Sequence, residues 1–293
     1  MRLRCLAPAK VNLSLFLGGT RADGRHRLVT LFESLSLADE LQLEVTGAAD
    51  EVICPGVEGE NLAARALAGL RARGWDGPPV RVQIEKHIPV AAGMAGGSAD
   101  AAATLRLAMA VAPGRAEEVD QLAAQLGADV PSQLLPGLAV GTGAGEVVEH
   151  FEALPEHAFV VLPSEFQLST PDVFREADRL GLQRSDEELE RLYEALVGAL
   201  APDPRLPGEL LVNDLQPAAV SLCPWCGDAL DAMLAAGAES ALVSGSGPTV
   251  VGIWWGLGAV GRAFSAAQQL RERYPLAVGA EPVSAEYAAP TLT

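Results

Sequence analysis

One glycine-rich stretch decides the fold: Lys86-His87-Ile88-Pro89-Val90-Ala91-Ala92-Gly93-Met94-Ala95-Gly96-Gly97-Ser98-Ala99-Asp100. It follows segment 80–85, whose alternation predicts a strand, and precedes segment 101–111, whose apolar residues predict a helix. Small residues let backbone N–H groups approach a ligand, and a helix start presents unpaired N–H groups and positive dipole to a phosphate. The stretch predicts a phosphate-binding loop; the alternative is a tight connection with Ser98 as an ordinary helix cap.

This loop matches neither of the two common nucleotide-binding motifs. It lacks the Gly-Lys-Ser/Thr sequence of a Walker A motif. It also lacks the glycine spacing and the downstream acid of a Rossmann fingerprint. Two common nucleotide-binding folds are therefore excluded.

The composition predicts a two-domain protein that binds a small molecule. The chain has 293 residues, 49% of them hydrophobic, which is enough for two buried cores. A formal net charge of -17 opposes broad attraction to nucleic acid or to an anionic membrane. Residues 240–261 carry no charge, but their glycines, serines and proline argue against a membrane span. Lys10 and Asn12 interrupt the apolar N-terminal stretch, so we expect no export signal and a cytoplasmic protein.

The four cysteines are scattered along the chain, which favours a reducing compartment. Cys223-Pro-Trp-Cys226 is the one close pair. A single CxxC cannot complete a zinc site, and Pro224 suits the first residue of a helix. We therefore interpret both cysteines as structural.

Two charged residues in apolar surroundings are candidates for catalysis. Only Lys10 and Lys86 are lysine among 21 basic residues, and Lys10 lies in an apolar segment where a cation needs a partner. A lysine that extends from a strand end to solvent is the alternative. Asp129 follows a predicted helix end at Gly127 and has small and apolar neighbours, although an aspartate there is often a turn former.

The second half of the chain predicts a βαββαβ arrangement. Polar residues 149–156 separate it from the first half, which gives domains at 1–152 and 153–293. An apolar strand at 158–162 is followed by helices with start signals at Thr170-Pro171 and at Ser185 with Glu188. Strands at 241–244 and 249–255, a helix near 259–273 and a strand near 277 complete the arrangement. The intervening Gly245-Ser246-Gly247-Pro248 is either a hairpin turn or a second backbone wall that faces the phosphate loop.

Taken in order, these motifs resemble the GHMP kinase family, in the branch that acts on a cytidylyl-linked methylerythritol. Six segments fall in the order and spacing of that family: 8–12, 21–24 with His26, 86–100, 126–131, 213–215 and 244–247. The resemblance implies an α+β, two-domain fold. Its N-terminal domain would be ribosomal-protein-like, its C-terminal domain ferredoxin-like, and the active site would lie between them.

The resemblance also implies an activity in the non-mevalonate isoprenoid pathway. The γ-phosphate of ATP, supplied with Mg²⁺, would pass to the 2-hydroxyl of the cytidylyl substrate. Asp129 would act as the base, and Lys10 would orient it and stabilise developing charge. No protein ligand for the metal is assigned.

Two sets of binding residues follow from the resemblance. The ATP-binding set is Asn61, Lys86, Pro89, Val90, Ala91, Ala92, Gly93, Met94, Ala95, Gly96, Gly97, Ser98 and Ala99. The substrate-binding set is Asn12, Arg25, His26, Thr170 and Phe174, in which His26 would read the cytosine edge and Phe174 would stack on its ring.

The chain departs from the family pattern at both sets. Arg25 and Arg27 stand where the family usually has Tyr and Glu, and Arg25 would replace the Tyr by stacking its guanidinium on the base. Alanines stand at positions 91, 92 and 95, where glycines are common, and Ala99 stands where Ser is common. Alanine resists positive φ, so we expect negative φ at all four alanines.

Three alternatives remain at this stage. A GHMP kinase for mevalonate, phosphomevalonate or homoserine would have no need of a pyrimidine reader at His26. A nucleotide-binding sensor without catalysis would have no need of Lys10 and Asp129. A plain structural α+β protein would require every motif to be a coincidence.

Overall fold

The computed structural model describes residues 1–57, 59–89, 93–201 and 206–293. Its strands are β1 Arg2–Thr20, β2 His26–Val45, β3 Glu51–Ile53, β4 Val80–Glu85, β5 Leu138–Thr142, β6 Val147–Phe151, β7 His157–Leu162, β8 Ser240–Val243, β9 Val250–Trp255, β10 Val278–Ala280 and β11 Thr291–Leu292. Its α-helices are α1 Leu62–Ala72, α2 Gly96–Val111, α3 Ala116–Leu126, α4 Val130–Leu134, α5 Thr170–Leu180, α6 Asp186–Ala199, α7 Gln216–Leu222, α8 Trp225–Ala235 and α9 Ala259–Leu270.

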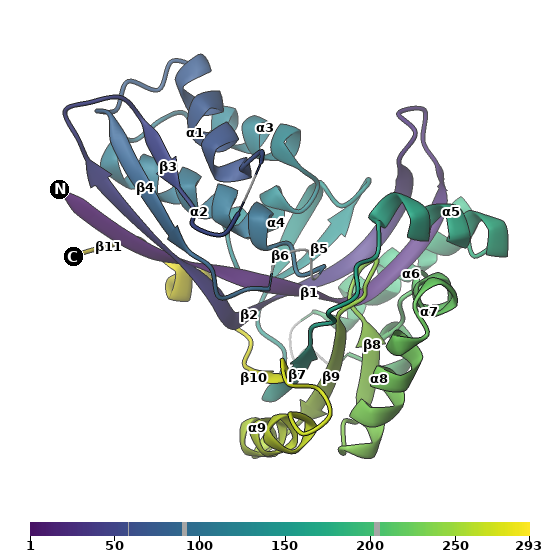
Figure 1. Ribbon diagram of the computed structural model, residues 1–293. Coiled ribbons are helices and arrows are strands. Elements are labelled where there is room, and N and C mark those ends of the chain that lie inside the picture. Colours follow the sequence, from purple (N-terminus) through teal and green to yellow (C-terminus); the bar gives the residue numbers. More distant parts are fainter. Residues whose placement is uncertain (58, 90–92, 202–205) are drawn as a thin grey trace.

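The first sheet is built around the long antiparallel pair of β1 and β2. Its strand order is β11-β1-β2-β4-β3, and β5 joins β2 to β6. Helices α1 to α4 gather on one side of this sheet (Figure 1). The core between them is made of small and branched residues of β1, β2 and β4 together with the alanine-rich α2.

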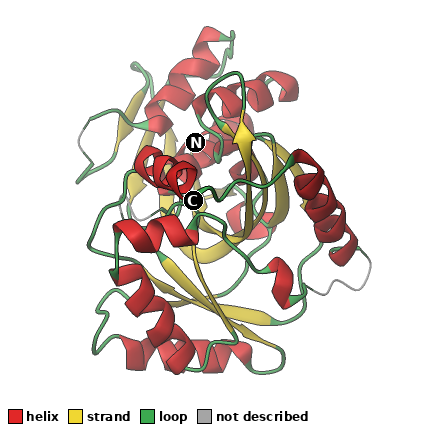
Figure 2. Ribbon diagram, turned by 90° about the vertical axis from the view of Figure 1, so that its right-hand side faces the viewer, coloured by secondary structure: helices red, strands yellow, loops and turns green. Residues whose placement is uncertain are grey.

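The second sheet confirms the predicted βαββαβ arrangement. Its order is β10-β7-β9-β8, and every pairing is antiparallel. Alternate residues of β7 face opposite sides, as strand geometry requires. Ala158 and Val160 pack with α7 to α9 in one core, whereas Phe159 and Val161 pack in another that lies toward the first sheet. Helices cover the outer sides of both sheets (Figure 2).

The register between β1 and β2 shifts near Lys10. Pro8 pairs with Ala38 and Lys10 pairs with Ser34, so two steps along β1 correspond to four along β2. The irregularity therefore places extra residues in β2. Cys5, before the shift, packs in the core under the helices, whereas Val11, after it, packs in the core between the two sheets. Lys10 and Asn12 lie on the wall of a cavity.

The two halves of the chain are not separated completely in space. Strands β1 to β6 precede residue 153 and β7 to β10 follow it, but β11 pairs with β1, so the end of the chain completes the first sheet (Figure 1). We retain the division into 1–152 and 153–293 as a proposal.

The predicted capping box of Ser185 with Glu188 is confirmed at the start of α6. Asn61 caps α1. Cys223 and Cys226 are free thiols, and both are buried. No helix of the described ranges is long and apolar enough to cross a membrane.

A buried ion pair joins the two sheets. His157 of β7 places Nε2 3.0 Å from Glu33 Oε2 of β2, and its Nδ1 lies 2.7 Å from the carbonyl oxygen of Pro155. Both ring nitrogens thus face acceptors, so both must carry a proton. Burial by itself lowers the pKa of His157, but the hydrogen bond and charge of Glu33 outweigh it, and the pKa is raised.

We expect Glu33→Gln to destabilise the protein by about 3 kcal/mol at pH 6, because it leaves a buried imidazolium without its counter-charge. Because the pKa of His157 is raised in the folded protein, the ion pair stabilises the fold fully below the pKa that histidine has in the unfolded chain. This stabilisation is lost as pH rises through the pKa of His157 in the folded protein. The difference between wild type and variant should therefore shrink toward pH 9. Urea unfolding across this range measures it, with the exposed Glu152→Gln as control. A pH-independent difference would contradict the charged pair.

Candidate active site

Most of the predicted site residues meet at one cavity of about 510 Å³. Its walls come from both halves of the chain. The lining residues from the predicted sets are Lys10, Asn12, Asn61, Lys86, Pro89, Gly93, Met94, Ala95, Gly96, Gly97, Asp129, Thr170 and Phe174. Gly245 and Ser246 of the second glycine segment also line it, together with residues for which the sequence predicts no role: Phe32, Cys54, Glu60, Asp100, Ala144 and Gly145.

An ion pair lies on the wall of this cavity. Lys10 Nζ is 3.3 Å from Asp129 Oδ1, although 119 positions separate the two residues in the chain. The lysine side chain is buried, and its ammonium also lies 4.9 Å from the centre of the Phe32 ring. The Asp129 side chain is 37% exposed, so its carboxylate remains open to a ligand. The predicted partner of Lys10 is thus Asp129 itself.

A chain of hydrogen bonds holds the lysine in place. Lys10 Nζ donates to Asn12 Oδ1 at 2.8 Å, and Asn12 Nδ2 donates to Thr30 Oγ1 at 2.7 Å. The Thr30 hydroxyl donates in turn to the Ser14 carbonyl oxygen. The backbone N–H of Asn12 donates to Ser244 Oγ, which ties β1 to the second sheet. Asn12 also lines the cavity, and its role along the substrate stays a prediction.

The predicted phosphate-binding loop, residues 89–98 and called the phosphate loop below, ends in the first turn of α2. Gly93 to Gly97 line the cavity, and the first N–H groups of a 16-residue helix lack intrahelical partners. The loop is attached to the strand beneath it, since Lys10 N–H donates to the Met94 carbonyl oxygen at 3.3 Å. Val90, Ala91 and Ala92 lie outside the described residues.

The structure corrects two expectations about this loop. Helix α2 starts at Gly96, not near residue 101, so Ser98 is in its first turn and does not cap it. Ala95 is the residue before the helix and has φ of 55°, a left-handed conformation, so the expectation of negative φ was wrong there. Ala99 is buried in the helical core, and neither it nor Ser98 is among the lining residues.

The second glycine segment faces the phosphate loop, as one of its two interpretations predicted. Gly93 has φ of 73°, and a Cβ at this position would lie 2.6 Å from the carbonyl oxygen of Gly247. Only a residue without a side chain permits this approach of two backbones. The segment from Gly245 to Gly247 is therefore the opposing wall, and Gly245 and Ser246 line the cavity.

Asn61 and Lys86 both line the cavity. Asn61 Oδ1 accepts from the N–H of Ala63 and so caps α1. Lys86 Nζ donates to Asp39 Oδ2 and to Asp100 Oδ2. Two carboxylates thus already balance the ammonium that was predicted to bind ATP.

Thr170 and Phe174 of α5 also line the cavity. His26 lies against Phe174, with ring centres 5.0 Å apart and an angle of 29° between the rings. Its Nε2 is 2.7 Å from Asp178 Oδ1, also on α5. His26 is not itself a lining residue, whereas Phe174 is. To hydrogen-bond a cytosine, His26 would have to reach the base past the edge of the Phe174 ring.

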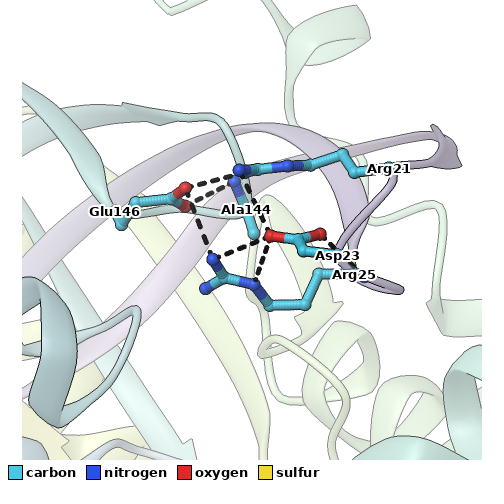
Figure 3. A network of polar contacts seen from close by, with 5 residues as sticks. All are labelled: Arg21, Asp23, Arg25, Ala144 and Glu146. Carbon is cyan, nitrogen blue, oxygen red and sulfur yellow. Dashed lines mark hydrogen bonds and ion pairs between the residues drawn. The ribbon is translucent and has the colours of Figure 1, made fainter.

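Arg25 belongs to an ion-pair network and is not among the lining residues (Figure 3). Its Nη2 lies 3.0 Å from Asp23 Oδ2 and 3.8 Å from Glu146 Oε1. Glu146 also accepts from Arg21 Nη1 and from the N–H of Ala144, which lines the cavity. Burial opposes ionisation of Glu146, but these donors outweigh it and lower its pKa. The network fixes the β1–β2 turn to the β5–β6 turn, and stacking on a base would require Arg25 to leave it.

Sequence reasoning missed several of these residues because no local pattern marks them. Asp39, Asp100 and Glu146 are single acids inside or beside regular elements, and Asp178 lies on the polar face of a helix. An acid opposite a predicted lysine or histidine is visible only after the elements pack. Asp100 lies within the glycine-rich stretch, but nothing in its local sequence indicates a role for it.

The comparisons with known proteins agree with this arrangement. Residues 61–137 match the sequence profile of the GHMP kinases N terminal domain, and residues 187–272 match that of the GHMP kinases C terminal. A curated 4-diphosphocytidyl-2-C-methyl-D-erythritol kinase from Streptomyces coelicolor is 44% identical over 261 residues, which cover 85% of this chain and 86% of the relative. The chain belongs to the GHMP kinase family. Its relatives at 35–45% identity are named as kinases, and the chain is an ATP-dependent phosphotransferase.

Other relatives place the chain more closely within the GHMP kinases. A kinase of the same name from Thermobifida fusca is 45% identical and covers 83% of both chains. The crystal structure of a 4-(cytidine 5'-diphospho)-2C-methyl-D-erythritol kinase matches with a TM-score of 0.75 and 35% identity, over 95% of this chain and 98% of that one. A homoserine kinase from Cytophaga hutchinsonii has a TM-score of 0.67 at 17% identity over 100% of this chain and 97% of its own, and it shares the fold.

Proposed function

We propose that this GHMP kinase transfers the γ-phosphate of ATP to the 2-hydroxyl of 4-diphosphocytidyl-2-C-methyl-D-erythritol, in the non-mevalonate isoprenoid pathway. The observation that carries the proposal is the Lys10–Asp129 pair, which shares one cavity with the phosphate loop. The substrate is taken from relatives that are 41–46% identical and carry that name. A small-molecule kinase of this kind would work in the cytoplasm, where ATP is available.

The two residues have complementary roles in this reaction. Asp129 would accept the proton of the attacking hydroxyl, which leaves the oxygen free to bond to phosphorus. The Lys10 ammonium, held by Asn12, would orient the carboxylate and stabilise the negative charge that develops on the transferring phosphoryl group. The helix start at Gly96 would hold the phosphates through backbone N–H groups.

Magnesium would enter with the nucleotide. The described residues contain no group of three or more metal-binding side chains. Mg²⁺ in kinases is bound mainly by phosphate oxygens and water, so a site without a protein cage fits this ion. When bound, it would neutralise phosphate charge. We assign it no protein ligand.

The proposal is tested by measuring ADP release from Mg·ATP with four samples: the cytidylyl substrate, mevalonate, homoserine and no acceptor. Turnover with the cytidylyl substrate alone is the expected result. Turnover with mevalonate or homoserine instead would retain the kinase and reject the substrate. ADP release that is equal in all four samples would reject phosphotransfer to any of these acceptors.

We expect His26→Ala to raise the KM for the cytidylyl substrate about tenfold, since one or two hydrogen bonds to the base are worth roughly 1.4 kcal/mol. The kcat should change little, because His26 contacts Phe174 and Asp178 of α5 and is proposed to act in binding, not in the chemical step. Steady-state kinetics measures both constants, with the exposed His150→Ala as control. An unchanged KM would mean that the base is read elsewhere.

A further inference from the structure

The turn between β5 and β6 forms part of the cavity wall with small residues. Ala144 and Gly145 of this turn are lining residues. Gly143 and Gly145 have φ of 74° and 105°, a region that only glycine enters readily. Glycine also gives the backbone more conformational freedom than any other residue. This part of the wall therefore keeps one shape only if other groups hold it.

The carboxylate of Glu146 holds this turn. Its Oε2 accepts from the N–H of Ala144 at 2.5 Å. A Cβ on Gly143 would lie 3.0 Å from both carboxylate oxygens, so the carboxylate lies directly over the turn. The N–H of Leu28 donates to the Gly143 carbonyl oxygen at 2.7 Å and ties the turn to β2. The path of the lining backbone thus depends on where the Glu146 side chain is held.

Two arginines of the β1–β2 turn hold Glu146 (Figure 3). Arg21 Nη1 donates to Glu146 Oε1 at 2.7 Å, and Arg25 Nη2 lies 3.8 Å from the same oxygen. Asp23 Oδ2 lies 3.3 Å from Arg21 Nη2 and 3.0 Å from Arg25 Nη2. Two cations and two anions therefore balance. The Glu146 side chain is only 16% exposed, which limits the screening of its ion pairs by solvent.

The same turn lies close to both members of the Lys10–Asp129 pair. A Cβ on Gly145 would lie 3.6 Å from the Phe32 ring and 4.0 Å from Ala128 Cβ. The Phe32 ring contacts the Lys10 ammonium, and Ala128 directly precedes Asp129 in the chain. A shift of the turn would therefore change the space beside the two residues that are proposed to act on the attacking hydroxyl.

The attachments of the turn associate it with the acceptor. Leu28, to which the turn is bonded, follows two positions after His26, which is proposed to read the base of the acceptor. Residues 21–25, which hold Glu146, directly precede His26. The residues predicted to bind ATP, at 61 and 86–99, come from other elements of the first sheet and its helices.

We propose that Glu146 is a positioning residue for the acceptor. Held by Arg21 and Arg25, its carboxylate keeps residues 143–145 where they form the wall of the acceptor's binding site. Glu146 itself is not a lining residue, so it acts through the turn and not by contact with the substrate. The inference rests on the proposed function, because it assumes that the acceptor occupies this part of the cavity.

Glu146→Ala tests this, because it removes the carboxylate and leaves the lining residues unchanged. We expect kcat/KM for the cytidylyl substrate to fall about tenfold, within the hundredfold that about 1 Å of misplacement can cost. The KM for ATP should change less than about twofold. The matched control is Glu44→Ala, which breaks a comparable ion pair with Arg2 at the other end of the β1–β2 pair, outside the cavity lining.

Arg21→Ala and the double variant separate positioning from a general effect on the fold. Arg21→Ala should lower kcat/KM for the acceptor about threefold, as the loss of a partly exposed ion pair allows. The double variant should be no worse than Glu146→Ala alone, because the arginine acts only through the carboxylate. A merely structural role would lower the unfolding temperature and the active fraction, so that kcat would fall while both KM values stayed unchanged.

The measurements are ADP release with acceptor and Mg·ATP varied in turn, and thermal unfolding of each variant. Wild-type kcat/KM for the acceptor in Glu146→Ala, an equal rise of both KM values, or losses that multiply in the double variant would overturn the inference and leave the proposed function intact. If Glu146→Ala does not fold, Arg21→Ala decides by the same criterion of a loss confined to the acceptor. Absence of turnover of the cytidylyl substrate by wild type would overturn both.

Discussion

Asp129→Asn is expected to lower kcat at least about a hundredfold, the lower end of what a positioned base contributes. The amide keeps the size of the carboxylate and can still accept from Lys10, but it cannot take the proton of the attacking hydroxyl. The KM for ATP should change less than about threefold, because Asp129 belongs to the chemical step and not to uniform binding. Steady-state ADP release at varied ATP measures both constants.

The control for this variant is Asp120→Asn, an exposed aspartate of α3 with no place in the cavity. It should be indistinguishable from wild type. Turnover of Asp129→Asn close to that of wild type would remove Asp129 from the mechanism. A similar loss in Asp120→Asn would instead indicate a general effect on the fold.

Among substitutions that add one methyl group to the phosphate loop, we expect Gly93→Ala to be the most damaging. The new Cβ would lie 2.6 Å from the Gly247 carbonyl oxygen, and φ of 73° disfavours any residue with a Cβ. Together the backbone strain and the overlap cost on the order of 3 kcal/mol. The loop must move away from the opposing wall, so we expect the KM for ATP to rise at least about tenfold, equivalent to 1.4 kcal/mol.

Gly74→Ala is the matched control, because Gly74 has φ of 83° but no atom lies within 4 Å of its added Cβ. It shares the backbone strain without the overlap and lies outside the cavity lining. Thermal unfolding and ATP kinetics of the two variants therefore separate strain from collision. If both variants keep the wild-type KM, the contact of the two glycine segments has no role in nucleotide binding.

The sequence was sufficient for those parts of the fold that depend on neighbouring residues. Alternation at 80–85, the capping signal at Ser185, and the succession of strands and helices after residue 157 are local patterns, and the structure confirms them. The start of α2 was misplaced because Gly96 and Gly97 are poor helix formers by local preference. There the packing of α2 against the first sheet outweighs propensity.

Ala95 shows why a local rule can fail at a site. Its preference for negative φ is sound for an isolated residue. In the folded chain the loop is held on both sides, at Met94 by the Lys10 N–H and at Gly93 by the Gly247 backbone. These contacts fix the path of the backbone, and Ala95 adopts a left-handed conformation within it.

By itself the sequence determined the family, and it offered the phosphate loop, Lys10 and Asp129 as candidates for the site, because ordered motifs and residue types are properties of the chain. Only the tertiary structure decided which charges meet. It pairs Lys10 with Asp129, places Lys86 between two carboxylates and keeps Arg25 in an ion-pair network away from the cavity lining. Partners that lie far apart in the chain meet only when the sheets and helices pack, and no local pattern encodes that geometry.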